Sequence, residues 1–150
     1  MKTKYILYPD QLPRYLRHIG NLYLKVVSRE LCDLELSNYF DFLITIERYE
    51  GTLTQKQLAG LMYIDKSSMV AILDFLVQKG FINVEQNPAD RRENLISLSK
   101  KGALAVSKIN DCETKIYDSM LDSVSPEQIR EVFDLLKKME LRLKEINRNT

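Results

Sequence analysis

Apolar residues recur every three or four positions in the first third of the chain, which is the spacing of amphipathic helices. Residues 12–27 carry one such stripe, and residues 37–49 carry a second. Gly51 follows the second stripe and is expected to end that helix, because glycine is common just beyond a helix. This part of the chain is therefore predicted to form one long helix and one shorter helix.

Two short helices joined by a tight turn are predicted next. Thr54 and Gln57 have the spacing of a capping box, which indicates a helix from residue 54 to about residue 62. Asp65 is a good N-cap for a following helix, and Gly80 is placed to end it. The apolar stripe of this second helix consists of Met69, Ile72, Leu73 and Leu76. Together these features are the outline of a helix-turn-helix.

Beyond Gly80 the apolar period changes from helical spacing to alternation. Residues 81–85 and 95–98 alternate as strands do, and residues 87–90 between them, Asn-Pro-Ala-Asp, are typical of a turn. The charged link between the two strands is expected to project from the body of the domain. A hairpin directly after a helix-turn-helix is a wing, so a winged helix is predicted.

The remainder of the chain is predicted to be helical. Ser99 can cap a helix that runs to about residue 122, and residues 125–128, Ser-Pro-Glu-Gln, have the pattern of another helix start. The stripe of the last helix comprises Ile129, Val132, Phe133, Leu136, Met139, Leu143 and Ile146. This stripe and the one over residues 12–27 are expected to pack on a partner. The predicted fold class is mainly α with a small β-hairpin (α+β).

The composition argues against an enzyme. The chain has 150 residues, 45% of them hydrophobic and 29% charged, which is ordinary for a globular domain. Cys32 and Cys112 lie far apart, His18 is the single histidine, and no glycine-rich phosphate loop occurs. A histidine-based triad and a multi-histidine metal site are therefore excluded within one chain, and no cofactor or metal is expected.

A cytoplasmic protein that does not enter a membrane is expected. No apolar run approaches the roughly 20 residues that a membrane-spanning helix needs. The first five residues, Met-Lys-Thr-Lys-Tyr, lack the apolar stretch and cleavage site of a signal peptide.

The helix after Asp65 is a candidate DNA-binding element. Its apolar stripe turns Ser67, Ala71, Asp74 and Gln78 outward. Lys66, Ser67 and Ser68 at its start can donate hydrogen bonds to phosphates or base edges, assisted by free backbone N–H groups. Val70 or Ala71 can lie against a thymine methyl group. The alternative interpretation is an ordinary solvated first turn.

The predicted wing carries a second candidate site. Arg92 on a projecting loop suits the narrow minor groove, whose negative potential attracts arginine. Asp90 lies two residues earlier and can hold the guanidinium in one pose, whereas Arg91 is a phosphate candidate. The alternative is a solvated charged turn.

Several of these segments together resemble MarR-type regulators. The similarity is carried by Leu53-Thr54-Gln55-Lys56-Gln57-Leu58-Ala59, Asp65-Lys66-Ser67-Ser68, residues 76–80, Asn87-Pro88-Ala89-Asp90-Arg91-Arg92 and Leu98-Ser99-Lys100-Lys101-Gly102. The resemblance implies a dimeric winged-helix DNA-binding protein, commonly a repressor of a pseudo-palindromic operator. It implies that Arg92 is the minor-groove arginine with Asp90 as its support, and that Lys66, Ser67 and Ser68 belong to the recognition helix. Gln55 and Lys56 join the candidate DNA-binding residues.

The same resemblance implies how the chain is divided. A single domain of residues 1–150 is expected, with the DNA-binding winged helix at 52–99. Segments 1–35 and 100–150 would supply the dimerisation helices, which is the partner that the two long apolar stripes require.

Two departures from the family pattern favour an alternative function. Val70-Ala71 stands where the family often has Thr-Arg, and Phe75 stands where a basic residue is frequent. Residues 52–102 carry 7 basic and 5 acidic groups, which is a small excess for a DNA-binding segment. The alternative is a winged-helix protein–protein interaction module that does not bind DNA, with an exposed Phe75 on its outer face.

The resemblance also implies a small aromatic or phenolic effector. Tyr15, Tyr39 and His18 are the candidate ligand contacts, although tyrosines on a helical stripe are more often core or interface residues. Cys112 lies on an apolar stripe, where packing is its expected role, and the sequence leaves open whether Cys32 or Cys112 is redox-active.

Overall fold

The structure is a computed structural model that describes residues 8, 10–49 and 53–148. Gly51 and the N-terminal segment used to argue against a signal peptide lie outside the described residues. The chain forms two compact units, residues 1–114 and residues 115–150, and each is described by itself.

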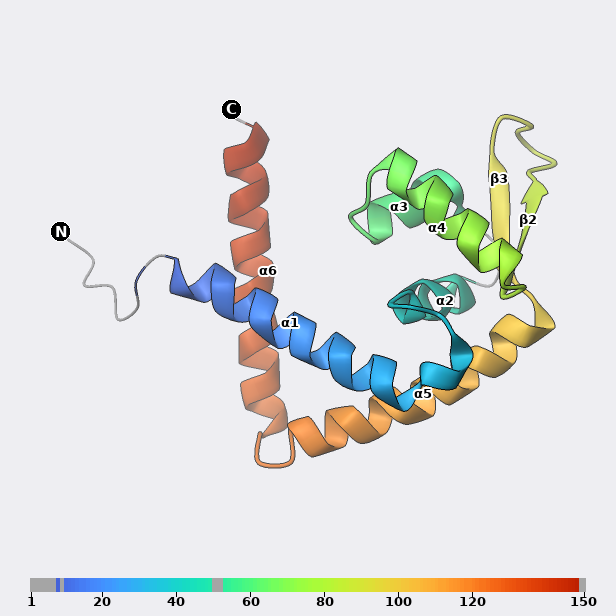
Figure 1. The fold of residues 1–150 in the computed structure, drawn as a ribbon. Coiled ribbons are helices and arrows are strands. Elements are labelled where there is room, and N and C mark those ends of the chain that lie inside the picture. Colours follow the sequence, from blue (N-terminus) through green and yellow to red (C-terminus); the bar gives the residue numbers. More distant parts are fainter. Residues whose placement is uncertain (1–7, 9, 50–52, 149–150) are drawn as a thin grey trace. The chain divides into compact units, whose positions relative to one another are not determined.

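Helices dominate, with one small sheet in the first unit (Figure 1). The elements are α1 (Gln11–Glu30), the 3₁₀ turn η1 (Cys32–Leu34), α2 (Phe40–Arg48), β1 (Leu53–Thr54), α3 (Gln55–Leu61), α4 (Lys66–Gln78), β2 (Ile82–Gln86), β3 (Asn94–Leu98), α5 (Lys100–Met120) and α6 (Pro126–Arg148). The predicted mainly helical winged helix is confirmed. None of the helices in the described part of the chain could cross a membrane.

The predicted helix starts are confirmed by their capping bonds. The Thr54 hydroxyl accepts from the Gln57 amide while the Gln57 side chain accepts from the Thr54 amide, which completes the capping box of α3. Ser125 and Gln128 form the same reciprocal pair at the start of α6, at 3.2 and 2.9 Å. The Ser99 hydroxyl accepts from the Gly102 amide at 3.0 Å and caps α5. Each pair satisfies amides that a helix end leaves without intrahelical partners.

The predicted start of the second helix at residue 37 is wrong. Ser37 has φ +56° and Glu35 has φ +51°, both in the left-handed region, so a right-handed helix cannot run through this segment. Helix α2 begins at Phe40 instead. Tyr39, the first apolar residue of the predicted stripe, lies at the N-cap position just before the helix.

The sheet has one more strand than the predicted hairpin. Strand β3 lies between β1 and β2 and pairs antiparallel with both. Ile96 at its centre stands opposite Leu53 and Val84 and is fully buried. Strand β1 escaped the sequence analysis because two residues are too short to show an alternating pattern.

The core of the first unit collects the apolar stripes of several elements. The predicted stripe of α4, Met69, Ile72, Leu73 and Leu76, is buried throughout. The core also contains Leu43 and Ile46 of α2, Leu58 of α3, Phe81, Ile96, Val106 and Ile109. Burial of the α4 stripe turns the opposite face of that helix outward.

Helix α5 begins in close contact with the residues that lead into β2. The Ser99 amide donates to the Phe81 carbonyl at 2.9 Å, and the Ser99 hydroxyl donates to the Gly80 carbonyl at 2.6 Å. A Cβ atom on Gly102 would lie 2.0 Å from the Phe81 carbonyl oxygen. Only glycine therefore fits at this approach.

Helices α1 and α6 leave most of their apolar side chains exposed. Val27 is the only buried residue of α1, and none of the residues of α6 is buried. The large exposed side chains are Leu12, Tyr15, Leu16, Ile19, Leu22 and Leu24 on α1 and Val132, Phe133, Leu135, Leu141, Leu143 and Ile146 on α6.

Candidate nucleic-acid interface

The first turn of α4 is organised by Asp65. Its carboxylate accepts from the backbone amides of Ser67 and Ser68 at 3.0 and 2.9 Å. It also accepts from the hydroxyls of Ser67 and Ser68 at 2.5 and 2.6 Å. These hydrogen bonds, those from the two hydroxyls first, hold the pKa of the Asp65 carboxyl far below its usual range. The side chain therefore stays ionised near neutral pH and fixes both serine rotamers.

This cap changes what the serines can offer. The sequence analysis expected free backbone N–H groups and hydroxyl donors at the start of α4. Both serine amides and both hydroxyl protons instead point at Asp65, so the two serines present oxygen lone pairs outward. An N-cap carboxylate satisfies the same amides that a phosphate would otherwise bind. The remaining cationic donor of the turn is the Lys66 ammonium.

The outer face of α4 is accessible, as the stripe predicted. Ser67, Ala71, Asp74 and Gln78 are exposed. Val70 on the flank has 42% of its surface exposed.

The wing is built around Asn87 and Asp90. The Asn87 side chain accepts from the Ala89 amide at 2.9 Å, and the Asp90 carboxylate accepts from the Arg92 amide at 3.0 Å. The Glu93 amide donates to the Asp90 carbonyl, and the Asn87 amide donates to the Glu93 carbonyl. Such turns, in which a side chain replaces a backbone acceptor, fix the path of a short loop.

Asp90 supports Arg92 differently from the expectation. The sequence analysis placed its carboxylate on the guanidinium, whereas the structure places it on the backbone amide of Arg92. Asp90 thus orients the backbone at Arg92. The side chains of Arg91 and Arg92 are exposed at the surface. A carboxylate engaged by the backbone leaves the full cationic charge of Arg92 available to a ligand.

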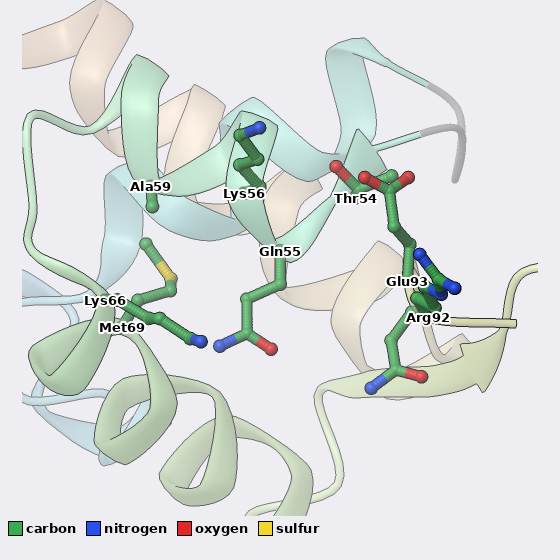
Figure 2. A pocket seen from close by; sticks show the side chains of 9 residues that line it. Thr54, Gln55, Lys56, Ala59, Lys66, Met69, Arg92 and Glu93 are labelled. Carbon is green, nitrogen blue, oxygen red and sulfur yellow. The ribbon is translucent and has the colours of Figure 1, made fainter. Parts of the chain in front are cut away.

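A hollow of about 410 Å³ lies between the start of α3, the start of α4 and the wing, and is named here the α3–α4–wing hollow. Its lining residues are Thr54, Gln55, Lys56, Ala59, Lys66, Met69, Arg92, Glu93 and Asn94. Figure 2 shows Gln55 and Lys66 pointing toward one another from α3 and α4, with Arg92 contributed by the wing. Four of the candidate DNA-binding residues are therefore brought together from three elements.

The model of the MarR family matches residues 37–94. Over these residues the chain is similar to the MarR family. The matched segment runs from the residues before α2 to the first residue of β3, and so contains the helix-turn-helix, β2 and the loop of the wing.

Solved structures of the MarR type are similar to the chain over most of its length. One MarR crystal structure shares 22% sequence identity, covers 97% of this chain and 100% of that chain, and has a TM-score of 0.75. A mutant MarR from E. coli complexed with operator DNA shares 21% identity over 87% of this chain and 94% of that chain, with a TM-score of 0.77. The transcriptional regulator SlyA shares 19% identity over 91% and 96%, with a TM-score of 0.82. At these identities the similarity shows the fold.

The three candidate ligand residues do not lie at one place. Tyr15 and His18 line a shallow hollow on α1 together with Gln11, Leu12 and Arg14, and their ring centroids are 6.5 Å apart. Tyr39 is half-buried beside α2, where its ring contacts Phe42 edge-on at 5.6 Å. Cys32 is exposed and Cys112 is half-buried.

Phe75 is not the exposed outer-face residue that the protein-interaction alternative assumed. Its ring contacts the Tyr39 ring at 5.4 Å, and the Lys79 ammonium lies 5.9 Å from its centroid. The side chain is half-buried, with Tyr39 from the segment before α2 packed against it. The main structural support for that alternative is therefore removed.

Some of the residues that line the hollow were not predicted from the sequence to belong to a site. Glu93 and Asn94 reach it from the end of the wing, and Ala59 and Met69 line it from the two helices. Met69 was assigned to the core stripe alone. The available signal was the position of Glu93 and Asn94 directly after Arg92, but β1, which joins β3 to the start of α3, was not predicted.

Burial raises the pKa values of two further side chains, Tyr23 of α1 and Glu113 of α5. Burial, the nearby Glu113 carboxylate and a hydrogen bond to it raise the pKa of Tyr23 to about 12. Burial raises the pKa of the Glu113 carboxyl, and the hydrogen bond from Tyr23 partly opposes this. In the described part of the chain no cluster of three or more histidine, cysteine or acidic side chains is placed to hold a metal ion.

Proposed function

We propose that this chain is a sequence-specific DNA-binding transcriptional regulator, a ligand-responsive repressor that binds a pseudo-palindromic operator as a homodimer. The observation that supports this best is the α3–α4–wing hollow. It collects Gln55, Lys56, Lys66 and Arg92 from three elements, so that one duplex can meet all of them. The similar E. coli MarR structure holds operator DNA in the same fold.

In this proposal α4 lies in the major groove and the wing lies in the flanking minor groove. The N-terminal residues of a recognition helix contact base edges, which places Lys66, Ser67 and Val70 nearest the bases. Arg92 enters the minor groove, where negative potential is greatest in A·T-rich sequence. Arg91 and Lys56, both exposed, are placed to contact phosphates.

The homodimer is proposed to use the exposed apolar faces of α1 and α6. Phe133 and Leu143 of α6 have 55% and 63% of their surfaces exposed, and Tyr15 of α1 has 64% exposed. Contiguous apolar faces of this kind on soluble helices mark protein interfaces. Two-fold symmetry would match the symmetry of a pseudo-palindromic site.

A small aromatic or phenolic effector is proposed to bind at the hollow of about 630 Å³ on α1. Tyr15 and His18 supply two rings there, and Arg14 supplies a cation for a carboxylate or phenolate. Titration with benzoate and with phenol, followed by calorimetry, tests this site, and an Arg14→Ala variant with unchanged affinity for benzoate would remove Arg14 from it.

The DNA-binding proposal is tested by fluorescence anisotropy with the chain's own upstream duplex and a scrambled duplex at several salt concentrations. Arg92→Ala is expected to weaken binding to the A·T-flanked site by about 1–3 kcal/mol, or roughly 5- to 150-fold. Arg91→Ala is the matched control, because losing a phosphate contact weakens both duplexes equally and lowers the salt slope by about one. Absence of binding to either duplex at low salt would contradict the proposal.

The dimer is tested by size-exclusion chromatography with light scattering. Replacing Leu136 and Leu143 with glutamate is expected to give monomers, because the charges would be buried in the interface. Lys137→Glu changes the charge of the same helix at an exposed position and is expected to leave the dimer intact. A dimer that survives the double substitution would refute the assignment of α6.

A further inference from the structure

The outer face of α4 has few hydrogen-bond donors that could reach a base. Recognition of guanine in the major groove requires two donors, usually from arginine or lysine, aimed at O6 and N7. Lys66 is the only cationic residue within α4, and its side chain lines the α3–α4–wing hollow. The hydroxyl protons of Ser67 and Ser68 are held by Asp65. The first turn therefore lacks a side-chain donor pair for guanine on its outer face.

The middle of the same face is apolar. Ala71 there is exposed, and Val70 on its flank is 42% exposed. The next exposed residue on the face, Asp74, lies one turn further along and offers only acceptors. A carboxylate is repelled by the acceptor edge of guanine and is compatible with the amino groups of adenine and cytosine.

We infer that Val70 and Ala71 bind the 5-methyl group of thymine, so that the recognition helix selects A·T pairs in each half-site by apolar contact. Thymine is the one base with a methyl group in the major groove, and its partner adenine offers the amino group that Asp74 can accept from. This inference rests on the proposed DNA-binding function and names the chemistry by which it selects sequence.

Deoxyuridine substitution isolates the methyl contact. Deoxyuridine differs from thymidine only in the absent methyl group, which lies in the major groove, so the minor-groove edge met by Arg92 is unchanged. The probe is the duplex that the full-length protein selects from a random library, with each thymine replaced by deoxyuridine in turn. One or two replacements in each half-site are expected to weaken binding about fourfold each, the factor that burial of one methyl group supplies.

Two valine variants locate the contact. Val70→Thr replaces one methyl group with a hydroxyl and is expected to lower affinity for the thymine duplex and to reduce the deoxyuridine effect, which Ala71 still partly supports. Val77→Thr is the matched control, since Val77 is 45% exposed on the same helix but lies two turns further from its start. It is expected to leave both affinities unchanged.

The outcomes separate this inference from the function on which it rests. Sequence-selective binding that is insensitive to every deoxyuridine replacement would overturn the methyl contact and leave the regulator intact. Loss of binding on replacing guanine with 7-deazaguanine, which removes the N7 acceptor, together with an inert deoxyuridine scan would show guanine recognition instead. Failure to select any sequence from the library would overturn both.

Discussion

Gly102→Ala should destabilise the first unit, because the start of α5 leaves no room for a side chain. The added Cβ would lie 2.0 Å from the Phe81 carbonyl oxygen and 3.2 Å from a Leu98 methyl group. The closest partner is backbone and cannot rotate away. The first turn of α5 must therefore retreat by at least about 1 Å before the contact reaches an acceptable distance.

The cost can be worked from what that retreat disturbs. Overpacking of a rigid contact costs about 1–3 kcal/mol. The bond from the Ser99 amide to the Phe81 carbonyl, 2.9 Å long, weakens with it, and a hydrogen bond contributes about 1 kcal/mol net. Replacing glycine with alanine in a helix returns up to about 1 kcal/mol. The net loss is expected to be about 2 kcal/mol, or about 4–8 °C in Tm for a chain of this length.

Thermal unfolding followed by circular dichroism measures this loss, with Gly20→Ala as the matched control. Gly20 lies within α1, and a Cβ atom there meets nothing within 4 Å. That variant is expected to be more stable by up to about 1 kcal/mol, since only the helix preference changes. If Gly102→Ala were as stable as Gly20→Ala, the close approach of α5 to Phe81 would be refuted.

Two pH-dependent effects are expected from the perturbed carboxyls. Because the pKa of Asp65 is lowered on folding, its contribution to stability is present above about pH 4 and is lost as the pH falls toward the folded value. Asp65→Asn should therefore show a smaller fall in Tm between pH 5 and pH 3 than the wild type, and an equal fall would contradict the cap. Because the pKa of Glu113 is raised, its contribution is present below about pH 4.5 and is lost as the pH rises. Glu113→Gln should gain stability relative to the wild type between pH 4 and pH 7, and a constant difference would exclude titration of Glu113.

Capping residues and apolar stripes made most of the fold predictable from the sequence. Thr54, Asp65, Ser99 and Ser125 marked four helix starts, and all four cap as expected. These signals are local, because the partners lie within three residues along the chain. The start of α2 was misjudged because the left-handed φ of Ser37 has no local signature in a residue other than glycine.

The sequence predicted which residues form the candidate site better than it predicted the hydrogen bonds that they make. Gln55, Lys56, Lys66 and Arg92 were identified, and they line one hollow. The sequence pattern does not show that Asp65 competes with an outside ligand for the serine donors, because the same residue types serve for capping and for donation. The same holds for Asp90, because spacing alone does not tell whether its carboxylate accepts from the amide of Arg92, as the structure shows, or from the guanidinium.

Thr54 belongs to β1 and also caps α3, and this limits how far the start of α3 can move relative to the sheet. It pairs with Leu95 as the last residue of β1, and it caps α3 at the next residue. A single row of the sheet, Thr54 opposite Leu95, therefore fixes the separation between the start of α3 and the base of the wing. That separation cannot change without breaking both the strand pair and the cap. In the proposed homodimer, the distance that can change is therefore the one between the two copies of this rigid unit of α3 and wing.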